Sequence, residues 1–407
     1  MTAATEAPFT LAVPDAELAL LHKKLELVRL PDELDGAGWD YGVPLADIRR
    51  LVARWQDDFD WRKAEAGINQ LPMFTRDIEV DGFGTLNIHY VHQKSEVKNS
   101  IPLLFVHGWP GDFLEVRKIL PLLTANTGDH PSFHVVAPSL PGFGFSQGAK
   151  KPGFAGRHYA EVVHKLMLSL GYDEYVYQGG DWGYPIGMHA VTHYGHKHIK
   201  AWHTNMPDAP DPTFLSNPLL FLSKHTILRF DREAQAGFQK MALHCQKGRG
   251  YAIEQCTKPQ TLGYGLADSP VALLAWIYEK LVSWTDNYPW TDDEVLEWVS
   301  VYWFSREGPA ASLRIYYEMT GGRAYDEYEG TRRTSVPFGT SYFPAEIFWL
   351  PKSWVRTIGK VVFEAVHDKG GHFAAFEQPE ALVGDLRKMY GGGGPTYGAV
   401  PEKSGYD

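Results

Sequence analysis

The chain of 407 residues has little cysteine, no long apolar run and no glycosylation acceptor of the Asn-x-Ser/Thr type. Its two cysteines, Cys245 and Cys256, have no CxxC or histidine partner at metal-ligand spacing, so neither a disulfide framework nor a metal site is supported. No stretch approaches the roughly 18 apolar residues of a membrane-spanning helix. Residues 1–14 lack the basic and apolar pattern of a secretion signal. We therefore expect a soluble cytoplasmic protein with no metal and no membrane partner.

Positive charge is also scarce, because 39 lysines and arginines stand against 49 aspartates and glutamates, a formal net charge of −10. Such a balance argues against nucleic acid or an anionic membrane as the main partner. Apolar residues are plentiful: hydrophobic residues make up 44% of the chain and aromatic residues 14%. This composition is typical of an ordered globular protein, and the length allows one large domain with insertions or two to three units.

The N-terminal part of the chain carries two helical patterns, at 14–31 and 45–61, and then an antiparallel pair of strand patterns, at 74–80 and 86–92. After these, short apolar runs alternate with segments of helix length. The apolar runs lie at 103–106, 133–137, 175–178, 200–205 and 361–366. Strands that alternate with helices predict a mostly parallel sheet covered by helices on both faces.

The strand pattern stops between residue 207 and about residue 334, where Leu, Trp and Tyr recur at helical spacing. We interpret this stretch as a helical lid over the carboxyl ends of the strands, where open α/β sheets bind ligands. The predicted organisation is an N-terminal extension, an α/β core in two parts separated by the lid, and a flexible glycine-rich tail. Their bounds are 1–73 for the extension, 74–206 and 335–390 for the core, 207–334 for the lid and 391–407 for the tail.

The run Gly179-Gly180-Asp181-Trp182-Gly183 has the small-x-nucleophile-x-small layout of the nucleophile elbow in the α/β-hydrolase fold. A strand pattern leads into it and a helical pattern at 184–194 leads out, which is the context that the motif requires. Aspartate takes the place of the usual serine. At the amino end of a helix, free N–H groups and the helix dipole favour an anion there.

An aspartate nucleophile restricts the chemistry of the elbow. A carboxylate that attacks an sp3 carbon forms an alkyl ester, which water can later cleave at the carboxyl carbon. A serine that attacked the same carbon would form an ether, which water does not cleave. The elbow therefore predicts displacement at carbon rather than peptide or ester hydrolysis.

The loop after the strand pattern 103–106 reads His107-Gly108-Trp109-Pro110-Gly111. In this fold that loop supplies one backbone N–H to an oxyanion hole, and the residue after the nucleophile supplies the other. The predicted donors are therefore the main-chain N–H groups of Trp109 and Trp182.

His372 follows the last strand pattern, so it should lie over the same sheet edge as Asp181 and act as the base. The chain order nucleophile, acid, histidine is the order of this fold. The predicted acid is Glu346, which follows the neighbouring strand, and Asp368 and Glu364 are the alternatives. Three other histidines cluster at the end of the post-elbow helix, where imidazole complements the helix dipole, and we do not assign them as metal ligands: His193, His196 and His198.

Together these motifs resemble the microsomal-type epoxide hydrolases of the α/β-hydrolase fold. The resemblance extends over roughly residues 8–390 and includes a segment that looks like the family's N-terminal part. Its motifs lie at 60–62, 68–74, 107–111, 138–146, 179–183, 343–346 and 370–373. Some relatives have a membrane anchor, and we expect none here.

The resemblance implies an enzyme that converts apolar epoxides to vicinal diols through a covalent ester of Asp181, with no cofactor and with the epoxide and water as its small-molecule partners. It also implies two lid tyrosines that grip the epoxide oxygen. By motif these are Tyr251 and Tyr316, with Tyr317 as the alternative to the second, and a phenol pKa near ~10 suits donation to an alkoxide. Asp112 stands where relatives commonly have serine. The resemblance also implies a role in aromatic-hydrocarbon catabolism or detoxification. The sequence leaves open whether the protein forms a homodimer.

Three other functions share parts of this pattern. A haloalkane dehalogenase would use the same aspartate and histidine and a tryptophan that holds the halide, but the lid tyrosines favour the epoxide. A catalytically silent scaffold of this fold is hard to reconcile with nucleophile, base and acid all present. A dinucleotide enzyme is not supported, because Gly142-Phe143-Gly144 lacks the third glycine at the required spacing.

Overall fold

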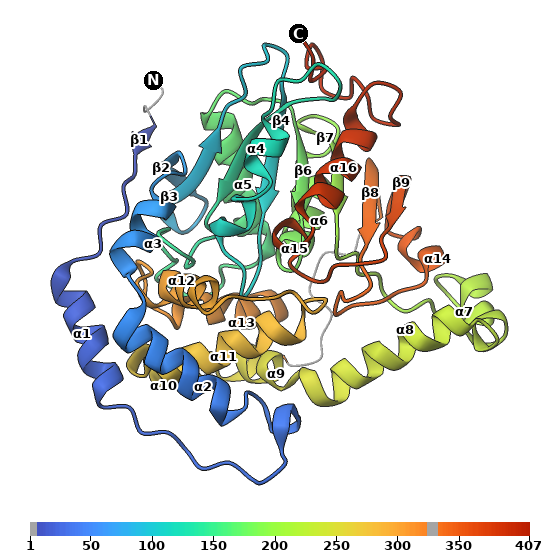
Figure 1. Cartoon of the computed structure of the whole chain (residues 1–407). Helices are drawn as coiled ribbons and strands as arrows, with labels where there is room; N and C mark the ends of the chain where they lie inside the picture. The colour runs from blue at the N-terminus through green and yellow to red at the C-terminus, as the bar shows by residue number, and fades with distance from the viewer. Residues whose placement is uncertain (1–5, 324–332) are drawn as a thin grey trace.

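The structure is a computed structural model that describes residues 6–323 and 333–407 (Figure 1). Residues 1–5 of the predicted extension and 324–332 of the predicted lid lie outside the described residues. Within the described residues, nine strands form one sheet in the order β1-β2-β3-β5-β4-β6-β7-β8-β9. The strands are β1 (Ala7–Pro8), β2 (Met73–Val80), β3 (Gly84–Gln93), β4 (Ile101–Val106), β5 (Phe133–Pro138), β6 (Tyr175–Gly179), β7 (Ile199–Thr204), β8 (Thr334–Tyr342) and β9 (Gly359–Val366).

The sheet is antiparallel at one end and parallel over the rest. β1, β2, β3 and β5 pair antiparallel in turn, and β5, β4, β6, β7, β8 and β9 pair parallel. Alternate residues of one strand enter different cores: Leu104 and Val106 of β4 join one apolar cluster, and Leu103 and Phe105 join the other. Both faces are therefore covered, which is why the central strands are continuous apolar runs. The predicted α/β class, a mostly parallel sheet with helices on both faces, is confirmed.

Helices of the core cover the two faces of the sheet. Residues of α5 and α6 belong to one apolar cluster, and residues of α4 and α16 belong to the other. The core helices are α4 (Leu120–Leu123), α5 (Gly156–Ser169), α6 (Gly183–Tyr194), α14 (Lys352–Val355), α15 (Ala374–Glu377) and α16 (Pro379–Tyr390). Because α6 begins four residues after β6 ends, the turn between them is tight and lies at the carboxyl edge of the sheet.

The stretch predicted as a lid is helical and lies along the lower side of the sheet in Figure 1, between β7 and β8 in the chain. Its helices are α7 (Pro218–His225), α8 (Arg232–Leu243), α9 (Gly250–Thr257), α10 (Pro259–Asp268), α11 (Pro270–Ser283), α12 (Asp292–Trp303) and α13 (Arg314–Thr320). Aromatic residues of α9, α11, α12 and α13 belong to the same buried cluster as residues of the core, so these helices are held against the sheet.

The N-terminal helices brace these lid helices. α1 (Asp15–Glu26) and α2 (Leu45–Ala53) both pack on α11. The Lys24 ammonium lies 2.7 Å from the Asp268 carboxylate at the end of α10. The helical pattern predicted over 45–61 is interrupted, because Phe59 is extended and Asp60 begins α3 (Trp61–Ile68) as its N-cap.

Residues 391–407 are packed against the core, contrary to the prediction of a flexible tail. Gly405 donates its N–H to the carbonyl of Asn99 and accepts from the N–H of Ser132, each at 2.8 Å. Gly405 has a φ of +84°, and a Cβ there would collide with Pro131, so glycine is required for this approach. Val400 is buried in the same region. The glycine run permits tight turns here rather than a free end.

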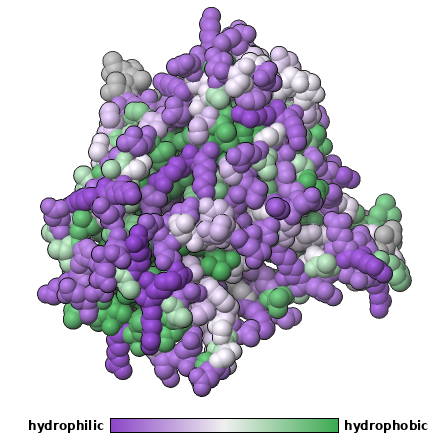
Figure 2. All heavy atoms as spheres, viewed as in Figure 1, coloured by the Kyte–Doolittle hydropathy of each residue, from purple (hydrophilic) through white to green (hydrophobic). Residues whose placement is uncertain are grey.

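The face seen in Figure 2 is mostly hydrophilic, with apolar side chains at the lower left, in the upper middle and on the segment around α7 that projects to the right. Leu215 and Leu219 of this segment are 94% and 81% exposed. Among the described residues, none of the helices combines the length and the apolar character needed to cross a bilayer.

Candidate active site

The tight turn between β6 and α6 carries Asp181. Asp181 has a φ of +48°, a left-handed conformation that is unusual for a residue with a side chain. A Cβ at Gly179 would lie 2.7 Å from the carbonyl oxygen of Gly183, and a Cβ at Gly183 would collide with the backbone of Val106. Only glycine fits at both flanks, so the turn is as tight as the motif predicts and holds the aspartate above the sheet edge.

The Asp181 carboxylate is held by two backbone donors. Its Oδ1 accepts hydrogen bonds from the N–H of Trp109 at 2.8 Å and from the N–H of Trp182 at 2.7 Å. These are the two donors predicted for an oxyanion hole. A Cβ at Gly108 would collide with the Asp181 carboxylate, so this glycine lets the loop approach. The second oxygen, Oδ2, lies outside this pair of donors.

The loop that supplies Trp109 is fixed by two polar side chains. His107 is buried, which lowers its pKa to about 4, so at neutral pH it is uncharged. Its Nδ1 lies 2.9 Å from the Gly108 carbonyl, and its Nε2 accepts the N–H of Leu140 at 3.2 Å. Asp112, unexplained by the sequence, accepts the N–H of Leu114 at 2.6 Å and so caps the turn η3 (Phe113–Val116).

His372 connects Asp181 with an acid. Its Nε2 lies 3.3 Å from Asp181 Oδ2, and its Nδ1 lies 2.7 Å from Glu346 Oε1, with both His372 and Glu346 buried. Burial lowers the pKa of His372, but the Glu346 and Asp181 carboxylates outweigh this effect, so its pKa lies well above the ordinary value. Of the alternative acids, Glu364 pairs with Arg356 at 2.6 Å and Asp368 is exposed.

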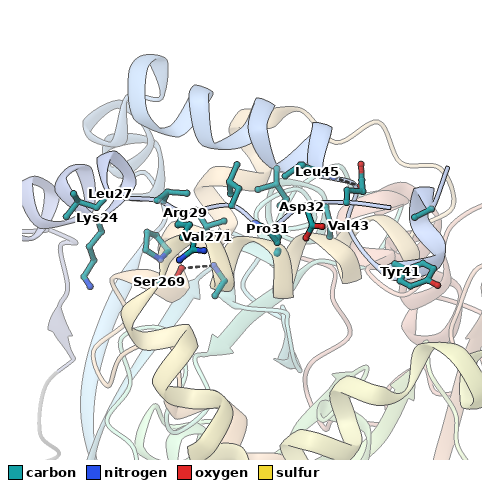
Figure 3. Close-up of a pocket in the computed structure, with 18 of the residues that line it drawn as sticks. Lys24, Leu27, Arg29, Pro31, Asp32, Tyr41, Val43, Leu45, Ser269 and Val271 are labelled. Atoms are coloured by element: carbon teal, nitrogen blue, oxygen red, sulfur yellow. Dashed lines mark hydrogen bonds between the residues drawn. The ribbon is translucent and has the colours of Figure 1, made fainter. Parts of the chain in front are cut away.

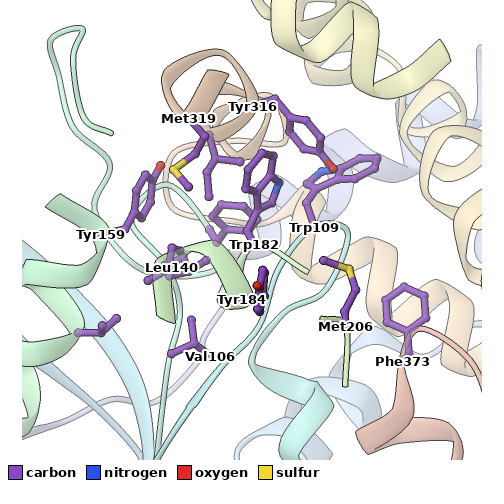
Figure 4. Close-up of a cluster of buried hydrophobic side chains, with 14 of the residues drawn as sticks. Val106, Trp109, Leu140, Tyr159, Trp182, Tyr184, Met206, Tyr316, Met319 and Phe373 are labelled. Atoms are coloured by element: carbon purple, nitrogen blue, oxygen red, sulfur yellow. The ribbon is translucent and has the colours of Figure 1, made fainter. Parts of the chain in front are cut away.

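Two tyrosines, one on α9 and one on α13, pack against the tryptophans that bond to Asp181. Tyr251 and Tyr316 are buried, with ring centroids 5.9 Å apart. Tyr251 stacks on Trp109 at 5.4 Å, and the Tyr316 ring meets Trp182 edge-on at 4.8 Å, beside Trp109 (Figure 4). Burial raises the pKa of both phenols, and the Asp181 charge adds to the rise, so both stay protonated at neutral pH. Tyr317 is 41% exposed, so the structure brings Tyr316 to the site instead.

Several residues that the sequence did not single out hold the histidine and the acid. Lys240 of α8 donates from Nζ to the carbonyls of Pro344 at 2.6 Å and Glu346 at 2.8 Å. The carbonyl of Trp284 accepts the His372 N–H at 2.9 Å, and Asn205 donates from Nδ2 to the His372 carbonyl at 3.3 Å. Since these contacts join residues far apart in the chain, no local pattern could have indicated them.

The histidine cluster does not form a metal site, and the pocket in Figure 3 is separate from the site around Asp181. His193, His196 and His198 bond separately to the His189 carbonyl, Ser335 and the Asp173 carbonyl. The described residues contain no group of three or more His, Cys, Asp or Glu arranged to hold a metal ion. The pocket in Figure 3 lies between 24–48 and 268–275 and contains none of the predicted site residues.

Comparison with known proteins identifies the family. The model of the epoxide hydrolase N terminus matches residues 6–116, and that of the alpha/beta hydrolase fold matches residues 101–244. Epoxide hydrolase 1 of Sus scrofa is 35% identical, over 94% of this chain and 88% of its own.

Two solved structures are also similar. The epoxide hydrolase of Aspergillus niger has a TM-score of 0.79 at 34% identity, over 94% of this chain and 95% of its own. The juvenile hormone epoxide hydrolase of Bombyx mori has a TM-score of 0.85 at 30% identity, over 94% and 93%. These matches favour epoxide hydrolysis over the dehalogenase alternative. The chain has the α/β-hydrolase fold and belongs to the epoxide hydrolase family.

Proposed function

We propose that this epoxide hydrolase opens its substrate by attack of Asp181 on an epoxide carbon, which forms a covalent alkyl ester. The observation that carries the proposal is that the two carboxylate oxygens of Asp181 have different partners. Oδ1 is held by two backbone N–H groups, and Oδ2 faces His372 at 3.3 Å. Oδ2 is therefore the attacking oxygen, and Oδ1 becomes the ester carbonyl, already seated in the donors that will hold its negative charge during hydrolysis.

Tyr251 and Tyr316 donate to the epoxide oxygen as the ring opens. Opening places a developing alkoxide beside buried side chains, where a hydrogen-bond donor lowers the barrier. Support comes from the burial of both phenols, from their raised pKa values and from their positions beside Trp109 and Trp182, the residues that hold Asp181.

His372 activates the water that cleaves the ester. In the free enzyme the Asp181 and Glu346 carboxylates both raise the pKa of His372. When Asp181 becomes an ester its charge disappears, so one of the two contributions is lost and His372 releases its proton more readily. The histidine can then accept a proton from water while Glu346 keeps the ring oriented through Nδ1.

The residues around Asp181 favour an apolar substrate. Side chains that line the core beside the elbow are aromatic or aliphatic, and Figure 4 shows Trp109, Trp182, Tyr316, Met319 and Leu140 gathered there. Such a surface favours aryl or alkyl epoxides over charged ones. The activity would suit aromatic-hydrocarbon catabolism or detoxification, and the helices of 207–334 would close over the bound epoxide as a lid.

A single turnover in water enriched in oxygen-18 tests the covalent mechanism. With enzyme in excess, the diol should contain no label, because its new oxygen comes from Asp181, and the label should enter the Asp181 carboxylate. Mass spectrometry of the diol and of the peptide that contains Asp181 measures both. Later turnovers should then transfer label to the diol. Label in the diol of the first turnover would rule out the ester.

The Glu346→Gln variant should hydrolyse the ester about 10²-fold more slowly, because a poorly oriented base loses much of the ~10²–10⁴-fold that general-base catalysis contributes. Its alkylation rate should change little, since Asp181 needs no base to attack. Stopped-flow kinetics separates the two steps. Asp368→Asn is the matched control, because Asp368 is exposed and should leave both steps unchanged. If Asp368→Asn slows hydrolysis and Glu346→Gln does not, the assignment of the acid is wrong.

A further inference from the structure

A third carboxyl group, that of Glu115, comes to the site from the loop after β4. Glu115 lies on the turn η3 and lines the same small cavity as Asp181 and His372. Gly111 makes room for it, because a Cβ at this glycine would collide with Glu115 Oε1. Within the described residues the Glu115 carboxyl makes no hydrogen bond to the protein. Its oxygens are therefore available to a molecule in the cavity.

The cavity has the size of one water molecule. Its water-accessible volume is about 10 Å³, close to the room that a single water needs. Asn205 and the backbone of Gly180 and Gly108 complete its polar wall. A water held there would lie between the base, the carbon to be attacked and Glu115.

The ionisation of Glu115 is coupled to the state of Asp181. Burial raises the pKa of Glu115 to about 8, the charges of Asp112 and Asp181 raise it as well, and His372 lowers it. With Asp181 ionised, Glu115 is therefore protonated at neutral pH. In the ester the Asp181 charge no longer raises this pKa, and a His372 that has released its proton no longer lowers it, so burial keeps Glu115 protonated and its carbonyl oxygen can accept a hydrogen bond from water.

We propose that Glu115 positions the water that cleaves the Asp181 ester, an inference that rests on the covalent mechanism proposed above. One O–H of the water donates to His372 Nε2 and the other donates to the Glu115 carboxyl, which points the oxygen lone pair at the carboxyl carbon of Asp181. His372 takes one proton as the new C–O bond forms. The bond from that carbon to the alkyl oxygen then breaks, and the diol oxygen receives the proton from His372. Glu115 orients the water and gains no proton.

The other buried carboxyl groups near the site are engaged elsewhere. Glu377 accepts the N–H of Phe373 at 3.1 Å and the N–H of Asp286 at 2.9 Å, so both of its oxygens are in use. Asp112 caps η3 and does not line the cavity. Apart from Asp181, Glu115 is thus the carboxyl residue that lines this cavity in the described part of the chain.

The Glu115→Gln variant tests this role by single-turnover kinetics with an aryl epoxide. Alkylation of Asp181 should stay within about threefold of the wild-type rate. Hydrolysis should fall about 10- to 100-fold, because a water displaced by an ångström reacts much more slowly. In both proteins hydrolysis should accelerate with rising pH as His372 loses its proton, and the ionisation of Glu115 should add a further step to the pH profile of the wild type alone. Glu161→Gln, which removes a buried carboxyl on α5 far from the site, is the matched control and should leave both steps unchanged.

Unchanged hydrolysis in a folded Glu115→Gln variant, an equal loss in both steps or a pH profile that keeps every step of the wild type would overturn the role of Glu115. If the glutamine variant does not fold, Glu115→Asp takes its place, and it too should slow hydrolysis alone. Failure of the wild type to form an Asp181 ester would overturn the covalent mechanism itself and this inference with it. Mass spectrometry of the quenched wild-type protein distinguishes that outcome from the others.

Discussion

The His372→Gln variant is expected to form the Asp181 ester at close to the wild-type rate and then to stall. Attack by an ionised carboxylate needs no base, whereas hydrolysis needs a group that takes a proton from water. Loss of the base should slow hydrolysis by about 10²- to 10⁴-fold. The glutamine side chain fills similar space beside Glu346, so the surrounding loop should persist. Intact-protein mass spectrometry after quenching should show one substrate mass added to nearly every molecule.

The control for this variant is His193→Gln, at the end of α6. His193 is exposed and its Nδ1 bonds to the carbonyl of His189, so its loss should leave both steps unchanged. A folded His372→Gln protein that yields neither diol nor adduct would mean that His372 acts in ring opening as well. The proposed separation of the two half-reactions would then be wrong.

The double variant Tyr251→Phe/Tyr316→Phe is expected to lose nearly all alkylation while Asp181 and His372 stay in place. General-acid assistance is typically worth ~10²–10⁴-fold, and in the proposed mechanism the two buried phenols share it. Each single variant keeps one donor and should lose only part of this factor. Pre-steady-state measurement of ester formation in the three variants checks the expectation.

Tyr317→Phe is the matched control for the lid tyrosines. It removes a phenol hydroxyl one position away, on a side chain that is 41% exposed, and should not affect alkylation. An unchanged alkylation rate in the double variant would remove Tyr251 and Tyr316 from ring opening. Release of halide from haloalkanes would then become the activity to measure.

The parts of the site that lie within one turn were predictable because their residues are adjacent in the chain. The glycines around Asp181 are needed by the backbone of that turn, and the loop that contains Trp109 follows its strand directly. The parallel core was predictable for a related reason: strands covered on both faces appear as continuous apolar runs. The family resemblance added Tyr251 and Tyr316, which no periodicity could have distinguished from the other tyrosines.

Two predictions failed because the same sequence pattern is compatible with two different local structures. The glycines after residue 390 suggested a flexible tail, but Gly405 uses its conformational freedom to pack against Pro131. The helical spacing over 45–61 continues through a break at Phe59 and Asp60, and the buried residues on its two sides belong to different apolar clusters. Composition and spacing do not distinguish a packed tail from a free one, or a continuous helix from an interrupted one, because each outcome depends on what the segment contacts.

By itself the sequence determined the fold class, the elbow with Asp181, the loop that contains Trp109 and the candidate base, because each follows from a local motif or from its place after a strand pattern. The tertiary structure alone decided the rest. It brings Glu346 rather than Asp368 to His372, and Tyr316 rather than Tyr317 to the site. It also brings Lys240 to the backbone carbonyl of Glu346 and places Glu115 at the cavity beside Asp181. These choices depend on the packing of α8, α9 and α13 against the sheet, and contacts between distant segments leave no periodic trace in a single sequence.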